Sequence, residues 1–126
     1  MSLVLDAGGL IAVERDDRDV IALIKRERLA NRSPVTHGGV VGQVWRGGGG
    51  RQARLARLLP AIEIEPLDDD LGRRAGILLG AARAADVIDA ALVLLALDDD
   101  EVLTSDPQDL LELARAAGTH VELIPV

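Results

Sequence analysis

Short apolar runs alternate along the chain with longer stretches in which apolar residues recur at helical spacing. Residues 2–5 are largely apolar, as in a buried strand of a parallel sheet, and residues 61–65 alternate between apolar and polar. Val20 and Ile24 show the helical spacing in the segment that begins at Asp16. The pattern predicts strands at 2–5, 33–36, 61–65, 101–104 and 120–126, and helices at 8–14, 16–30, 38–47, 51–60, 68–84, 86–97 and 107–118.

The order of these elements indicates the fold class. Strands that alternate with helices favour an α/β sandwich with a mainly parallel central sheet. A chain of 126 residues is long enough for one domain with a substantial core, so we expect a single domain over residues 1–126. The glycine run at 47–50 is the one low-complexity patch, and we expect a flexible loop between helices there.

The composition narrows both the core and the chemistry. Hydrophobic residues make up 48% of the chain, yet Trp45 is the only aromatic residue, so the core must consist of Leu, Ile, Val and Ala. The absence of cysteine excludes disulfides, thiolate catalysis and zinc–thiolate sites. No apolar run approaches the roughly 20 residues that cross a bilayer, and the first residues lack the pattern of a signal peptide. We therefore expect a cytoplasmic protein without a membrane segment.

The net charge of −7 counts against a nucleic-acid-binding protein, because phosphate contacts normally need a basic surface. A nuclease with this charge needs bound cations or local arginine patches to offset it. The same acidity favours a basic protein as a partner.

Carboxylates stand at the ends of several predicted elements. Asp6 follows the first strand and Asp106 follows the strand at 101–104, and sites in open parallel sheets form beyond these carboxyl ends. Asp86 and Asp89, three residues apart, lie on one face at the start of the apolar helix. Carboxylates brought together raise one another's pKa unless a cation intervenes, and Mg²⁺ or Mn²⁺ suits an oxygen-only site. Such an ion activates water for phosphodiester hydrolysis.

Each of these carboxylates also has a structural interpretation. Asp106, followed by Pro107 and with an acid at Asp109, has the pattern of a helix start. Asp86 and Asp89 suit the N-cap and the first turn of their helix in the same way. For Asp6 the sequence favours function, because a lone carboxylate after a buried strand gains little structurally.

The residues that follow Asp6 are small, and the histidines stand alone. Ala7, Gly8 and Gly9 leave room for an ion and a phosphate beside the carboxylate. His37 and His120 are isolated in sequence, so we expect them at the surface or in packing rather than as ligands.

Other phosphate-handling motifs are absent. The segment RGGGGRQ lacks the Gly-Lys-Ser/Thr of a Walker loop, and no G-x-G-x-x-G follows a strand. Haloacid-dehalogenase-like phosphatases need a second aspartate where this chain has Gly8, and receiver domains need a late lysine where the only lysine is Lys25. A site made of carboxylates remains.

Four segments in this order resemble the PIN-domain family, specifically the VapC-type toxins of VapBC toxin–antitoxin pairs. They are VLDAGGLIA, VVGQVWRGG, DVIDAALVLLA and VLTSDPQDL, and the resemblance covers essentially the whole chain. It implies a three-layer α/β/α sandwich and a Mg²⁺-dependent ribonuclease. It also implies a cognate antitoxin, an RNA substrate and a homodimer, with which the leucine-rich faces at 51–59 and 71–79 are compatible.

The resemblance also assigns site residues. The family's Asp, Glu, Asp, Asp pattern falls on Asp6, Gln43, Asp89 and Asp106, and the three aspartates are the implied metal ligands. Asp86 and Asp109 are candidates for an outer shell, and Arg46, Arg51 and Arg54 are candidate RNA contacts.

This chain departs from the family pattern at two positions. Gln43 stands in place of an acid, and Gly8 stands where the family commonly has Ser or Thr. Two hypotheses therefore remain: a Mg²⁺-dependent endoribonuclease toxin, and a catalytically weakened or inactive PIN-fold module that acts by binding an antitoxin or RNA.

Overall fold

The computed structural model describes residues 2–126, and its centre is a parallel five-stranded sheet. Val4 pairs with Val35 on one side and with Val102 on the other. All five strands that the sequence predicts are present, with small differences at their ends. They are β1 (Leu3–Leu5), β2 (Val35–His37), β3 (Glu63–Glu65), β4 (Glu101–Thr104) and β5 (Glu122–Pro125), in the spatial order β3-β2-β1-β4-β5.

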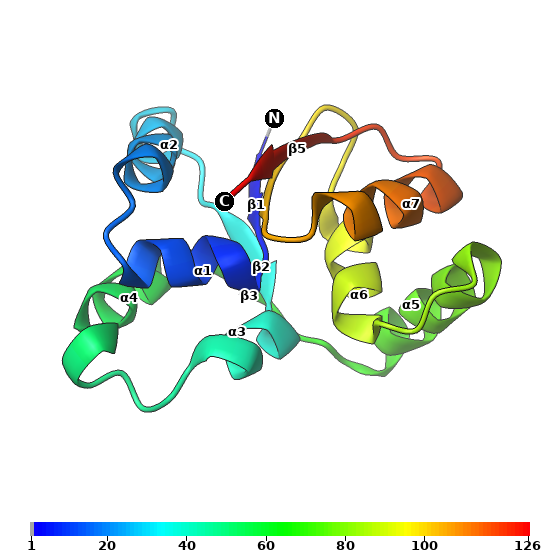
Figure 1. Ribbon diagram of the computed structural model, residues 1–126, viewed down its shortest axis with the longest axis horizontal. Coiled ribbons are helices and arrows are strands. Elements are labelled where there is room, and N and C mark those ends of the chain that lie inside the picture. The colour runs from blue at the N-terminus through cyan, green and yellow to red at the C-terminus, as the bar shows by residue number, and fades with distance from the viewer. Residues whose placement is uncertain (1) are drawn as a thin grey trace.

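Seven α-helices in residues 2–126 cover the two faces of the sheet (Figure 1). On one face lie α1 (Ala7–Glu14), α2 (Arg18–Leu29), α3 (Gly38–Val44) and α4 (Ala53–Leu58), with 3₁₀ turns at Gly50–Gln52 and Leu59–Ala61. On the other lie α5 (Asp69–Ala82), α6 (Val87–Leu95) and α7 (Pro107–Ala117). The chain is a three-layer α/β/α sandwich, as predicted. None of the described helices is long and apolar enough to cross a membrane.

The core is aliphatic, as the composition predicts. Leu3 and Leu5 of β1 and Leu103 of β4 are completely buried between the two helical layers. Leu10 of α1 and Leu110 of α7 are equally buried and pack on the sheet from opposite faces. Central strands packed on both faces hold the residues that follow them in defined positions.

The helix predicted over 38–47 is shorter in the structure, where α3 ends at Val44. Gly47 and Gly48 have φ values of +99° and +78°, which favour glycine. A Cβ on Gly48 would also collide with the indole ring of Trp45. Gly48 of the glycine run therefore lies against the ring of Trp45.

The chain changes direction across the sheet at β1. From β1 it proceeds through β2 to the edge strand β3, and it later returns to place β4 on the other side of β1. In open parallel sheets, ligands bind in the crevice that such a reversal opens beyond the carboxyl ends of the strands. Asp6 and Asp106 follow the two strands that border this crevice.

Candidate functional site

Asp6 connects β1 with the turn after β4. Its backbone N–H donates to the Leu103 carbonyl at 3.1 Å. One carboxylate oxygen accepts the Gly9 N–H at 3.0 Å and caps α1, and the other accepts the Ser105 N–H at 3.1 Å. The residue is only 5% exposed. Asp6 is therefore a structural cap, and its remaining lone pairs stay available to a ligand.

Gly8 allows α1 to approach the turn between β4 and α7. A Cβ on Gly8 would lie 2.8 Å from both Cβ and Oγ of Ser105. Ser105 thus occupies the space that a side chain at position 8 would take, and the bare backbone at Gly8 allows this close approach. That an ion and a phosphate fit beside Asp6 stays a prediction.

Asp106 precedes α7, but its side chain accepts no N–H from that helix. Its own backbone N–H donates to Oγ1 of Thr104 at 2.8 Å. The capping interpretation of Asp106 is therefore wrong, because the Thr104 hydroxyl organises this turn and leaves the Asp106 carboxylate exposed.

Asp86 and Asp89 divide the two roles that the sequence left open for them. Oδ1 of Asp86 accepts the Asp89 N–H at 3.1 Å and caps α6, so the capping interpretation of Asp86 is confirmed. Asp89 lies in the first turn of α6 and is partly buried.

The carboxylates at this edge of the sheet are close enough for their negative charges to repel one another. The pKa of Asp89 is raised to about 6, mainly by burial and then by the charges of four other carboxylates: Asp86, Asp106, Asp6 and Asp109. The aspartates that the sequence singled out, although far apart in the chain, therefore share one electrostatic neighbourhood.

Their chemistry suits a hard divalent cation. Within residues 2–126, no three His, Cys, Asp or Glu side chains stand close enough together to hold a metal ion by themselves. Mg²⁺ seldom uses such a cage, since it usually keeps several waters and binds one or two carboxylates together with substrate phosphates. An all-oxygen donor set whose charges repel one another fits Mg²⁺ or Mn²⁺ on these terms.

Asp89 lines a cleft of about 320 Å³, two of whose charged residues the sequence analysis does not predict. Asp86, Asp109, Glu112 and Arg83 also line it. Glu112 lies three residues after Asp109, and this spacing on one helical face is a signal that could have found it. Arg83 reaches the cleft from the end of α5, where it has a positive φ of 53°, and no sequence signal indicates this.

Gln43 lies in a different hollow of the surface. It is exposed on α3 and lines a groove of about 700 Å³ that none of the three candidate aspartates lines. The three arginines that we expect to contact RNA, Arg46, Arg51 and Arg54, all line this groove. Arg15 and Glu14 line it as well. The structure thus places Gln43 among cationic side chains.

A buried glutamine organises one wall of this arginine groove. Oε1 of Gln52 accepts the N–H groups of Arg46 at 2.7 Å and of Gly48 at 3.2 Å. Its Nε2 donates to the Val44 carbonyl at 2.8 Å and to Oε2 of Glu14 at 3.2 Å. Gln52 therefore fixes the glycine-rich turn that carries Arg46. Sequence reasoning missed this role, because a lone glutamine gives no local signal.

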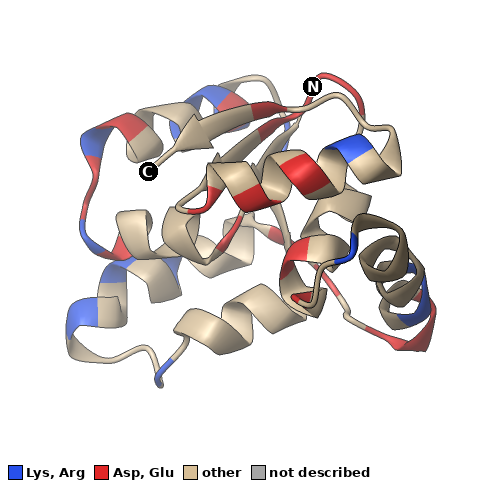
Figure 2. Cartoon of the chain, turned by 45° about the vertical axis from the view of Figure 1, so that its right-hand side comes forward, with Lys and Arg blue, Asp and Glu red and all other residues tan. Residues whose placement is uncertain are grey.

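Basic and acidic residues separate between the two halves of the chain. Ten of the 14 Lys and Arg residues lie between residues 15 and 57, whereas 15 of the 21 Asp and Glu residues lie between 58 and 126. Figure 2 shows acidic residues along α7 and at the start of α6, with basic residues around α4. The arginine patch that an acidic nucleic-acid-binding protein needs is therefore present.

Comparison with known proteins identifies the architecture. No family model matches the chain, and no curated protein does. Among solved structures, the chain matches one from the crystal structure of VapBC2 from Rickettsia felis bound to a DNA fragment from their promoter. The TM-score is 0.71 at 12% sequence identity, over 98% of this chain and 99% of that one. The chain therefore shares the fold of that VapBC2 chain. Since a shared fold does not by itself imply an activity, the function has to be argued from the site.

Proposed function

We propose that the chain is a Mg²⁺-dependent endoribonuclease and the toxin of a type II toxin–antitoxin pair. The observation that carries this proposal is the set of carboxylates at the crevice between β1 and β4, where the pKa of Asp89 is raised to about 6 by burial and by four neighbouring acids. Such repulsion is costly unless a cation neutralises it. The VapC-like fold supports the proposal, because the fold places this edge where open parallel sheets bind ligands.

The aspartates at this crevice have different roles in the proposed metal site. Asp6, Asp89 and Asp106 would hold Mg²⁺ or Mn²⁺ together with waters and a substrate phosphate, with Asp86 and Asp109 as outer-shell partners. When bound, the ion would supply Lewis-acid activation of water for attack on the RNA phosphate. Asp6 is held in place by two backbone N–H groups, so it serves as the fixed member of the set.

RNA binds through the arginine groove. Arg46, Arg51 and Arg54 contact the phosphates, and their charges offset the net charge of −7 along the path of the RNA. Gln43 lies among them, where its amide can orient water or a phosphate oxygen.

A second candidate function is binding without cleavage. Two observations favour it: Gln43 carries no charge, and no three acidic or histidine side chains in the described chain converge on one point. In that case the protein acts as a PIN-fold module that binds an antitoxin or RNA.

The proposed partner is an antitoxin protein. A groove of about 410 Å³ between α1, α2 and α4 has apolar walls from Val13, Ile21 and Leu58. Its charged residues are four basic ones and one acid, which are Lys25, Arg28, Arg54, Arg57 and Asp16. An amphipathic helix with acidic residues beside its apolar face fits such a groove.

The leucine-rich faces expected from the sequence are only partly available to a second subunit. Leu55, Leu71 and Leu78 are buried in the core of their own chain, whereas Ile77 is 75% exposed. The dimer therefore stays a prediction, which sedimentation equilibrium tests directly.

Calorimetry and an RNA cleavage assay test the proposed enzyme. We expect Mg²⁺ to bind in the millimolar range or tighter, and RNA to be cleaved only when Mg²⁺ or Mn²⁺ is present. Asp89→Asn should abolish both, whereas Asp70→Asn, on the exposed face of α5, should change neither. RNA binding without metal binding or cleavage would support the binding module instead. Cleavage that survives Asp6→Asn would show that the site is elsewhere.

A further inference from the structure

His37 is a buried histidine that the proposed chemistry does not use. It is the last residue of β2 and the N-cap of α3, and no part of it is exposed. Nδ1 accepts the backbone N–H of Gly39 at 3.1 Å, and Nε2 lies 2.9 Å from the carbonyl oxygen of Ile88. Because Nδ1 is an acceptor, the ring proton is on Nε2, which donates to Ile88. Burial lowers the pKa of His37, in keeping with a neutral ring.

The surroundings of the ring are shaped to hold it. A Cβ on Gly39 would lie 2.6 Å from Cδ1 of Ile88, 2.9 Å from Cε1 of His37 and 3.0 Å from Cδ2 of Leu67. Real Cβ atoms do not approach other atoms this closely, so a side chain at position 39 would force the ring, Ile88 or Leu67 to shift. The imidazole therefore lies in a packed socket formed by β2, α3, α6 and Leu67.

This socket joins two of the elements that carry candidate site residues. Ile88 directly precedes Asp89 in the first turn of α6, and α3 carries Gln43. The histidine ring crosses from the helical layer of α3 to that of α6, and its partner Ile88 is 51 residues away in sequence. No other side-chain hydrogen bond of the described chain joins the carboxyl end of β2 to α6.

We propose that His37 is a positioning residue of the acidic site. By donating to the Ile88 carbonyl, it fixes the first turn of α6 against the corner between β2 and α3, and so sets the position of the Asp89 carboxylate relative to Asp6 and Asp106. The effect of His37 on metal binding rests on the proposed function, whereas the anchoring of α6 by His37 rests on the geometry alone.

The substitution His37→Asn separates the two bonds of the ring. The asparagine Oδ1 can replace Nδ1 as the cap for the Gly39 N–H, but the shorter side chain does not reach Ile88. We expect α3 to stay folded, while amide hydrogen exchange in the first turn of α6 becomes about tenfold faster in the metal-free protein. Affinity for Mn²⁺, measured by calorimetry, should fall about tenfold, as for other groups that orient metal ligands. RNA affinity measured in EDTA should not change.

Ile24→Val controls for a general loss of stability, because it trims the core at α2, on the other helical layer from α6. This control should leave Mn²⁺ affinity unchanged. If His37→Asn behaves like Ile24→Val, with normal exchange in α6 and normal Mn²⁺ affinity, His37 is a packing residue and the proposal is overturned.

A measurement on the unmodified protein covers the case in which His37→Asn does not fold. Long-range ¹H–¹⁵N spectra report the tautomer, and we expect a slowly exchanging Nε2–H on a neutral ring. A proton on Nδ1 would exclude the bond to Ile88 and overturn the proposal. If the unmodified protein binds no Mn²⁺ and cleaves no RNA, the proposed function fails, and the tautomer and the exchange rates still decide whether His37 anchors α6.

Discussion

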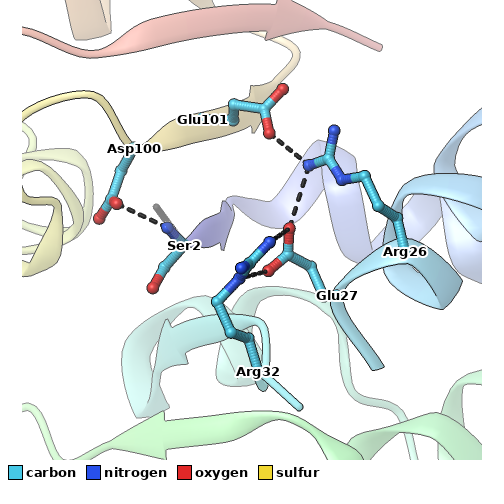
Figure 3. A network of polar contacts seen from close by, with 6 residues as sticks. All are labelled: Ser2, Arg26, Glu27, Arg32, Asp100 and Glu101. Atoms are coloured by element: carbon cyan, nitrogen blue, oxygen red, sulfur yellow. Dashed lines mark hydrogen bonds and ion pairs between the residues drawn. The ribbon is translucent and has the colours of Figure 1, made fainter. Parts of the chain in front are cut away.

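The two ends of the same sheet treat carboxylates in opposite ways. At the amino end, the buried Glu27 accepts from Arg32 at 2.7 Å and from Arg26 at 3.0 Å, and Arg26 also pairs with Glu101 (Figure 3). At the carboxyl end, the aspartates around Asp89 form no ion pair within residues 2–126.

The difference separates stability from function. Arginine partners lower the pKa of Glu27 and stabilise its charge, whereas burial and like charges raise the pKa of Asp89 and destabilise its charge. Unpaired acids with raised pKa values lower the stability of the fold, and such groups in a ligand crevice are typical of functional sites. The amino-end network is thus a structural clamp, and the carboxyl-end cluster is the candidate site.

Removing one arginine of the network should have the largest effect. Arg32→Ala leaves the side chain of Glu27, only 1% exposed, with one arginine partner instead of two. We expect the free energy of unfolding, measured by urea denaturation, to fall clearly more than on loss of an exposed pair, because the buried Glu27 charge loses one of its two partners. Arg73→Ala is the matched control, since its pair with Asp69 is exposed, and it should cost less than about 0.5 kcal/mol. Equal losses in the two variants would remove the contrast between the two ends.

Neutralising Asp89 should act on activity. Asp89→Asn removes a proposed ligand of Mg²⁺, so the rate of RNA cleavage should fall at least about 100-fold. Arg32→Ala, assayed at a temperature where it stays folded, should keep its activity, because the network lies at the far end of the sheet. A large loss of activity in Arg32→Ala under those conditions would mean that the two ends are coupled.

The sequence predicts the fold well because local patterns of apolar and polar residues determine where its strands and helices lie. Apolar runs and helical spacing locate the five strands and the order of the helices, and the aliphatic composition of the core is confirmed. The end of α3 was missed, because it depends on how Gly48 meets Trp45 and on the Gln52 amide.

The candidate site is less accessible to sequence reasoning, because its contacts are not local. Asp106 has the sequence pattern of a cap, yet the Thr104 hydroxyl takes the backbone N–H and the carboxylate does not cap α7. His37 looks isolated, but its partner is 51 residues away, and Arg26 meets Glu101 across 75 residues. Spacing in sequence identifies acids at element ends, and only the fold shows which of them are paired.

Adding Mg²⁺ should sharpen the contrast between the two ends. An ion that binds only the folded protein stabilises it by about 1.4 kcal/mol at ten times its dissociation constant. We expect this increase, measured by urea denaturation with and without Mg²⁺, in the unmodified protein and in Arg32→Ala, but not in Asp89→Asn. An equal increase in all three would place the ion away from the acidic cluster.

The smallest effect is a difference in pH dependence between the two ends. The pKa of Asp89 is raised from 3.8 to about 6, so between these values the folded protein binds more protons than the unfolded chain, and Asp89 lowers stability as pH rises through this window. In metal-free protein at pH 7, Asp89→Asn should therefore raise the free energy of unfolding by about 1 kcal/mol, a value reduced for solvent screening of a half-exposed group. This gain should shrink as pH falls from about 6 to 3.8 and vanish only well below 3.8, where Asp89 is protonated in both states.

The pKa of Glu27 is lowered from 4.5, so its contribution has the opposite sign: it is present above pH 4.5 and is lost as pH falls through the folded pKa. Urea denaturation between pH 3.5 and 7 of Asp89→Asn and of Glu27→Gln measures both slopes, and slopes of the same sign would contradict the assignment of one end to stability and the other to function.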